Sequence, residues 1–169
     1  WDEAVGFYVD RDLEGRLSPV QAVSGFYPLL LADTPPERVA ALARALQDPQ
    51  RFGAPCPVPS VSLSDPAFST DMWRGATWVN GNYLVIEGLR RHGLRDLADE
   101  LRERTIDLVD RYYRRFGVLF EFFDAADRVP PPACDRKGPH QEPYDIRRKM
   151  DSIRDYHWTA ALILCLLLS

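Results

Sequence analysis

Apolar residues recur at helical spacing in several separate stretches of the chain, and turn-forming residues mark where those stretches end. The pattern predicts helices over residues 25–31, 35–47, 78–92, 94–116 and 158–168. We expect Ser24 to cap the first helix, and Thr34 to form a capping box with Glu37 at the second. Gly93 and Gly117 are expected to end the third and fourth. The sequence therefore predicts an all-α protein.

The links between these helices alternate between short and long. Residues 32–33 and Gly93 form very short links, which force neighbouring helices to lie antiparallel. Residues 48–77 and 117–156 form long, proline-rich connections. If each pair of helices runs up and back, the long connections emerge at the same end of the protein. A site built from both connections is expected there.

Charge and hydropathy exclude some classes of partner. A formal net charge of −4 argues against nucleic acid as the main partner. The closing apolar run, 158–168, is about half as long as a bilayer span requires, so we expect a buried helix and no membrane partner. No secretory signal is visible, and a cytoplasmic location is the expectation. Because the chain begins at Trp1, we interpret it as an excerpt of a longer protein.

The cysteines and histidines predict neither disulfides nor a metal site. Cys56, Cys134 and Cys165 have neither an even count nor the spacing of zinc ligands, and the three histidines are scattered. No cofactor is expected.

The run DMWRGATWVNGNY, residues 71–83, carries the clearest binding chemistry. Sugars are bound by aromatic faces that stack on their C–H surfaces and by polar donors to their hydroxyls, and Trp73, Arg74 and Trp78 supply both kinds of group. Gly75 allows a tight turn between them. The run is equally compatible with an aromatic corner of the core that includes a cation–π contact. Both interpretations stay open on this evidence.

Glu121 is the carboxylate that we single out for catalysis. It lies between two phenylalanines, so it either points to solvent or sits in a site with partners. We favour the site, because the predicted topology brings the loop of Glu121 to the end that also holds Trp73, Arg74 and Trp158. Hydrolysis of a glycosidic bond needs a second carboxyl group. The nearby Asp71, Asp124 and Asp155 are each interpreted as structural or hydrogen-bonding residues.

The same motifs resemble a known family. The stretch WRGATWVNGNYLVIEGLRRHG is similar to the WRGPxWxxxNYLxxxGLxxYG signature of the six-hairpin α/α-barrel glycoside hydrolases. That family includes mannosylglycerate hydrolase and processing α-glucosidase I, with trehalase a more distant relative. WDEAVGFYVDRD, PVPSVSLSDPAF, LFEFFDAA and DYHWTAALILCLL follow in the order that the family shows. The similarity covers nearly the whole chain.

The resemblance implies an α/α toroid of the (α/α)6-barrel type and an inverting glycoside hydrolase that acts on an α-glucoside or α-mannoside. Glu121 would be its general base. Trp73, Arg74 and Trp78 would line the subsite of the cleaved sugar, with Trp158 nearby. The family's general acid belongs to a motif upstream of the WDEAVGF segment, and that motif has no equivalent in this sequence. Residues 1–169 are therefore expected to be the C-terminal portion of one catalytic domain, about half of the barrel.

Three departures from the family pattern change the expected site. Met72 stands at a usual tyrosine, and Ala76 at a usual proline. Residues 125–151, the expanded segment, replace a short glycine-rich turn, and either reshape the mouth of the pocket or form a disordered surface insertion. Two alternative functions stay open. One is another α/α-barrel sugar enzyme, a phosphorylase or an epimerase, and the other is a non-catalytic sugar-binding or interaction module.

Overall fold

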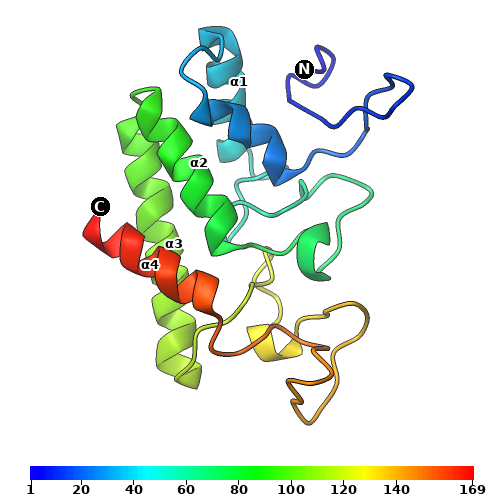
Figure 1. Cartoon of the computed structure of the whole chain (residues 1–169), viewed down its shortest axis with the longest axis vertical. Coiled ribbons are helices and arrows are strands. Elements are labelled where there is room, and N and C mark those ends of the chain that lie inside the picture. The colour runs from blue at the N-terminus through cyan, green and yellow to red at the C-terminus, as the bar shows by residue number, and fades with distance from the viewer.

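Four α-helices dominate the computed structural model, which describes residues 1–169 (Figure 1). The α-helices are α1 (Pro36–Gln47), α2 (Val79–Arg91), α3 (Arg95–Phe116) and α4 (His157–Leu168). Three short 3₁₀ helices accompany them: η1 (Val23–Leu30), η2 (Met72–Arg74) and η3 (Pro131–Ala133). There is no β-strand, only isolated bridges between extended residues. The predicted all-α class is confirmed.

The expected N-terminal caps of the first two helices are wrong. Ser24 lies inside η1, which begins at Val23 and is a 3₁₀ helix with Pro28 inside it. Proline lacks the N–H that an α-helix would need there. The N-cap of α1 is Pro35, without a side-chain cap. The Thr34 hydroxyl instead donates to the carbonyl of Pro28, which ties the start of α1 to η1.

The helix ends at the two predicted glycines are confirmed. Gly93 follows α2 with a φ of 75°, and Gly117 follows α3 in the left-handed conformation. Both conformations suit glycine because it has no Cβ. The short link makes α2 and α3 an antiparallel pair, and α2 also packs against η1 and α4. The core lies among these elements and extends to the fully buried Phe7 of the irregular N-terminal segment.

The two long connections meet, as the alternating links predict. Thr77 and Phe123 exchange a pair of backbone hydrogen bonds of 2.8 and 3.0 Å, and Thr77 also bridges to Pro59. The Glu121 N–H donates to the carbonyl of Ile153 at 2.9 Å. These contacts hold residues 75–78, 120–123 and 152–154 side by side, next to the starts of α2 and α4.

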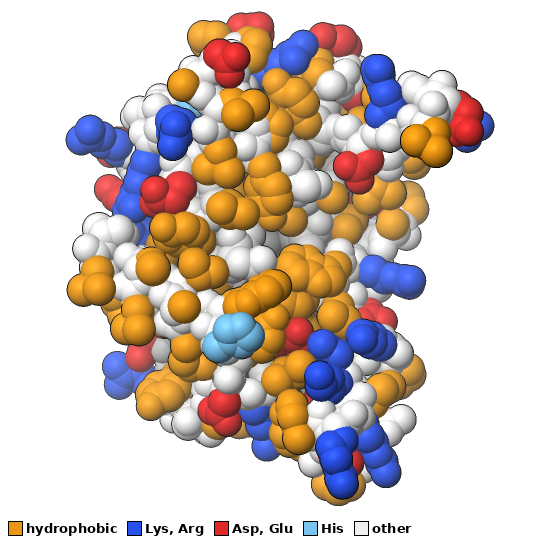
Figure 2. Space-filling model, in the orientation of Figure 1, with side chains coloured by type: hydrophobic (Ala, Val, Ile, Leu, Met, Phe, Trp, Pro, Cys, Tyr) orange, Lys and Arg blue, Asp and Glu red, His pale blue; other side chains and the backbone are white.

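Helix α4 is much less buried than its apolar sequence predicts. Only Thr159, Ile163 and Leu166 are buried. Leu164 and Leu167 are more than half exposed. Figure 2 shows the resulting spread of apolar side chains on the face that α4 forms. The expectation of a buried helix is corrected, because the described chain packs elements against only one side of α4. None of the helices combines the length and the apolar character that a membrane span requires.

This exposed surface leads to a first prediction. Residues 1–169 expressed alone are expected to self-associate, because large exposed apolar patches drive association. Light scattering would measure the mass, and the double variant Leu164→Ser/Leu167→Ser should shift it toward the monomer. A matched control, Leu13→Ser, changes a fully exposed leucine far from α4 and should leave the mass unchanged. A stable wild-type monomer would contradict the prediction.

Candidate active site

An aromatic wall runs from η2 to the start of α4. Trp73 stacks on Trp78 with ring centroids 3.7 Å apart and planes within 5° of parallel. Trp78 also contacts Phe122 at 5.2 Å and Tyr156 at 6.4 Å, and Tyr156 contacts Trp158 at 5.7 Å. The wall thus links three of the residues selected from the sequence, Trp73, Trp78 and Trp158, with the immediate neighbour of Glu121.

The two tryptophans of the WRG run have different surroundings. Trp78 is 3% exposed, and its indole N–H donates to the carbonyl of Met72. Trp73 is 43% exposed and covers Trp78. Gly75, between the two tryptophans, leaves no room for a side chain, because a Cβ there would lie only 2.3 Å from the carbonyl oxygen of Ser69. In this structure Trp78 packs as a core residue, and Trp73 is the ring with an exposed face.

Arg74 does not join the aromatic wall. Its side chain is exposed and makes no hydrogen bond, ion pair or cation–π contact. Arg74 therefore does not form the cation–π contact considered for this motif, although the two tryptophans do pack on each other.

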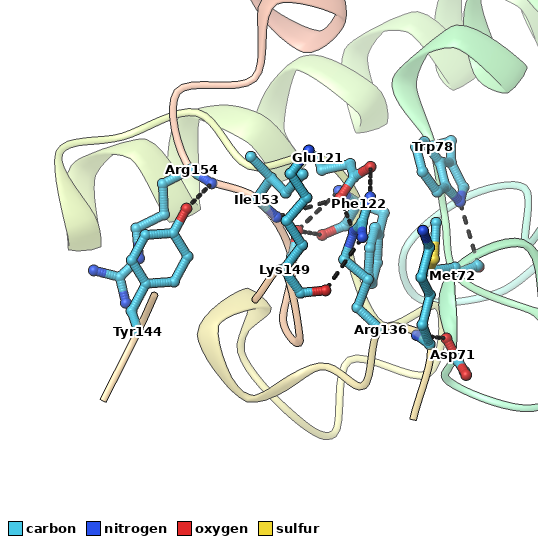
Figure 3. Close-up of polar contacts among 12 residues, drawn as sticks. Asp71, Met72, Trp78, Glu121, Phe122, Arg136, Tyr144, Lys149, Ile153 and Arg154 are labelled. Atoms are coloured by element: carbon cyan, nitrogen blue, oxygen red, sulfur yellow. Dashed lines mark hydrogen bonds and ion pairs between the residues drawn. The ribbon is translucent and has the colours of Figure 1, made fainter. Parts of the chain in front are cut away.

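Glu121 is buried and paired with Arg136 (Figure 3). The Arg136 guanidinium donates from Nε to Oε2 at 2.7 Å and from Nη2 to Oε1 at 3.2 Å. The backbone N–H of Ile153 also donates to Oε2, at 3.3 Å. Both side chains are largely removed from solvent, with 3% of Glu121 and 8% of Arg136 exposed. A carboxylate that points outward to water is excluded for this structure.

Arg136 belongs to the expanded segment, which is attached to the site at three places. The first is the pair with Glu121; within the segment, the Arg136 Nη1 also donates to the carbonyl of Lys149 at 3.2 Å. The N–H groups of Lys137 and Gly138 donate to the two carboxylate oxygens of Asp71 at 2.7 and 3.1 Å. The Tyr144 ring lies 4.1 Å beneath the Arg154 guanidinium. The segment therefore covers the Glu121 side of the site.

The three aspartates considered as acids lie in different environments. Asp71 accepts the two N–H groups of the expanded segment, and the buried Asp124 accepts the backbone N–H groups of residues 126, 128 and 129. Both are hydrogen-bonding residues, as interpreted from the sequence. Asp155 is exposed. These surroundings do not mark any of the three as a general acid.

Sequence reasoning missed three polar residues of the connection between α3 and α4. Arg136 and Tyr156 are two of them, and burial together with the nearby Glu121 charge raises the pKa of the Tyr156 hydroxyl. The third is Asp151, whose buried Oδ2 has no hydrogen-bond partner and whose pKa is raised by burial. No local pattern marks these residues, because each acquires its role through the path of an irregular loop.

The cysteines form no disulfide. Cys56 and Cys134 are buried and free, and Cys165 is exposed. Burial raises the pKa of the Cys56 and Cys134 thiols to about 12, so both stay protonated at neutral pH.

Comparison with known proteins identifies the class to which this fold and site belong. Residues 1–140 match the model of the mannosylglycerate hydrolase MGH1-like glycoside hydrolase domain. The chain belongs to this family of glycoside hydrolases, and the predicted resemblance is confirmed.

Individual relatives agree with the family. The chain is 37% identical over 115 residues to mannosylglycerate hydrolase from Thermus thermophilus, which covers 66% of this chain and 27% of that protein. It is 27% identical over 142 residues to a probable mannosyl-oligosaccharide glucosidase from Schizosaccharomyces pombe, which covers 73% of this chain and 18% of that protein. The chain thus spans about a quarter or less of the length of these relatives.

Solved structures have the same fold. A crystal structure of mannosylglycerate hydrolase from Thermus thermophilus in complex with glucose superposes with a TM-score of 0.70 and 27% identity, covering 99% of this chain and 36% of that one. Neutral trehalase from Saccharomyces cerevisiae superposes with a TM-score of 0.69 at 16% identity, a likeness of fold alone. The expected α/α-toroid fold is confirmed, and this chain corresponds to part of the neighbouring structures.

Proposed function

We propose that this chain supplies the general-base side of an inverting glycoside hydrolase acting on an α-linked glucoside or mannoside. Substrates of the mannosylglycerate, glucosylglycerate or α-gluco-oligosaccharide type fit the names of the relatives, a mannosylglycerate hydrolase and a probable mannosyl-oligosaccharide glucosidase. The observation that carries the proposal is the buried Glu121 carboxylate, held by fixed donors beside the aromatic wall. Carboxylates and aromatic faces are the groups that glycoside hydrolysis uses.

In this proposal Glu121 accepts a proton from the water that attacks the anomeric carbon. A second carboxyl group, roughly 6.5–9.5 Å away, protonates the leaving oxygen. Asp71 and Asp124 use both of their carboxylate oxygens for backbone hydrogen bonds, so neither carboxyl group is free to contact a leaving group. We therefore place the acid outside residues 1–169, in line with the greater length of the relatives. The assignment of 1–169 to the C-terminal portion of one catalytic domain is part of this proposal, as is a cytoplasmic location.

The test uses the full-length gene product. Mannosylglycerate, glucosylglycerate and α-linked glucobioses would be assayed without added cofactor, and ¹H NMR would follow the anomer of the sugar first released. Hydrolysis that yields the β-anomer supports the proposal. Phosphate-dependent cleavage would indicate a phosphorylase, and an epimerised product an epimerase. Sugar binding without turnover would indicate a binding module, and each of these results would overturn the proposal.

Sugar stacking is predicted for Trp73 rather than for the buried Trp78. Trp73→Ala should weaken sugar binding by about 1 kcal/mol, the scale of an aromatic contact, and glucose or mannose should change the tryptophan fluorescence of the wild type. Tyr113→Ala is a matched control, because it removes a similarly exposed aromatic ring from α3. Equal affinities for the wild type and Trp73→Ala would contradict the stacking role.

A further inference from the structure

We infer that Arg136, contributed by the expanded segment, is a positioning residue that fixes the Glu121 carboxylate in the orientation needed by a general base. The inference rests on the proposed function of Glu121. It assigns a role to a part of the chain that departs from the family pattern, and it follows from the contacts around the two carboxylate oxygens.

The donors are distributed unequally between these oxygens. Oε2 accepts from the Arg136 Nε at 2.7 Å and from the Ile153 N–H at 3.3 Å. Oε1 accepts only from the Arg136 Nη2, at 3.2 Å. A carboxylate oxygen has about two acceptor positions. Oε2 is therefore saturated, while Oε1 keeps a position for the proton of an attacking water.

The planar guanidinium also fixes the rotation of the carboxylate. Its two parallel N–H donors match the two carboxylate oxygens, so the plane of Glu121 follows the plane of Arg136. A general base needs this control, because a displacement of about 1 Å in a reacting group can cost roughly a hundredfold in rate. A lysine at the same place would keep the charge but lose the planar pair of parallel N–H donors.

Arg136 is itself held by the backbone around it. Its Nη1 donates to the carbonyl of Lys149, and its own N–H donates to the carbonyl of Gly138. The next two N–H groups bind Asp71, which directly precedes η2 and Trp73. One short loop thus connects the Glu121 carboxylate with η2, the 3₁₀ helix that carries the exposed Trp73. This connection fixes the position of the proposed base relative to the tryptophan ring on which the sugar would stack.

The experiment compares Arg136→Ala and Arg136→Lys with the wild type in the full-length gene product, using the mannosylglycerate and glucosylglycerate assays. Arg136→Ala should lower kcat roughly a hundredfold, the scale of a misplaced reacting group, with KM within about twofold. Arg136→Lys should retain an intermediate kcat. Added guanidinium ion should partly restore the kcat of Arg136→Ala when kcat is expressed per folded molecule, which separates positioning from folding. Arg147→Ala is the matched control, because Arg147 belongs to the same segment, is 87% exposed and pairs only with Asp145.

The kinetics of these variants distinguish a positioning role of Arg136 from a structural one. A kcat of Arg136→Ala equal to or above the wild type would overturn the inference, and an increase would show that the segment obstructs the site. If Arg136→Ala loses kcat and folded protein to the same extent, and guanidinium restores neither, the inference is also overturned, and the role of Arg136 is purely structural. If Arg136→Ala does not fold, a kcat of Arg136→Lys equal to that of the wild type overturns the inference. Glu121→Gln separates the two proposals. If Glu121→Gln is active, Glu121 is not the base and the proposed function fails. If Glu121→Gln is inactive while Arg136→Ala is active, only the role of Arg136 is refuted.

Discussion

Glu121→Gln in the full-length gene product is expected to lower kcat by ~10²–10⁴, the contribution of general acid–base catalysis. The amide has nearly the same shape as the carboxylate but cannot accept the proton of the attacking water. Because the sugar contacts stay in place, KM should change much less than kcat. Steady-state kinetics with each hydrolysed glycoside would measure both constants.

The control for this variant is Glu100→Gln, which makes the same substitution on the outer side of α3, where the carboxylate is 62% exposed. It should have the kinetics of the wild type. A Glu121→Gln enzyme with near wild-type turnover would remove Glu121 from the role of base. Because Gln leaves the buried Arg136 without its counter-charge, the folded fraction of the variant must be measured alongside.

Breaking the Glu121–Arg136 pair is expected to destabilise the protein strongly. Removing one partner of a buried ion pair leaves an uncompensated charge, at a cost of about 3–5 kcal/mol in the free energy of unfolding. Arg136→Ala exposes this cost most simply, because the Glu121 carboxylate remains buried. Urea unfolding followed by circular dichroism would measure it.

The double variant Glu121→Leu/Arg136→Met tests the physical reason. Replacing both members of a buried pair by apolar residues of similar size is often neutral, so the double variant should be more stable than Arg136→Ala alone. The surface pair Arg16–Asp12, in which the arginine is 75% exposed, provides the comparison, and Arg16→Ala should change the stability little. Equal urea midpoints for Arg136→Ala and Arg16→Ala would contradict the buried-pair account.

The sequence predicted those parts of the fold that depend on local chemistry. The left-handed glycines Gly93 and Gly117 end their helices where expected, because few other residues adopt that conformation at little cost. The alternation of short and long links correctly predicted that the two long connections lie at the same end of the protein, where residues 75–78 and 120–123 meet. The caps at Ser24 and Thr34 failed, because neighbouring prolines changed the backbone on which a cap depends.

The details of the site depend on non-local packing, which the sequence pattern does not contain. Nothing local distinguishes Trp73 from Trp78, and only the stack of one on the other makes the first exposed and the second buried. Arg136 reaches Glu121 across 15 residues of irregular chain without any periodicity to predict its course. The burial of α4 was overestimated for a related reason, since an apolar sequence does not specify what packs against it.

The most direct test of the central claim is the reaction of Glu121→Ala with azide. Truncation removes the base and opens a space beside the Arg136 guanidinium, which can hold the azide anion where the water would attack. With α-glucosyl or α-mannosyl fluoride as substrate, the account predicts that azide accelerates the variant and forms the β-glycosyl azide, the product of one inversion, which ¹H NMR identifies. Formation of the α-glycosyl azide, or no acceleration by azide, would contradict the account of Glu121 as the base of an inverting enzyme.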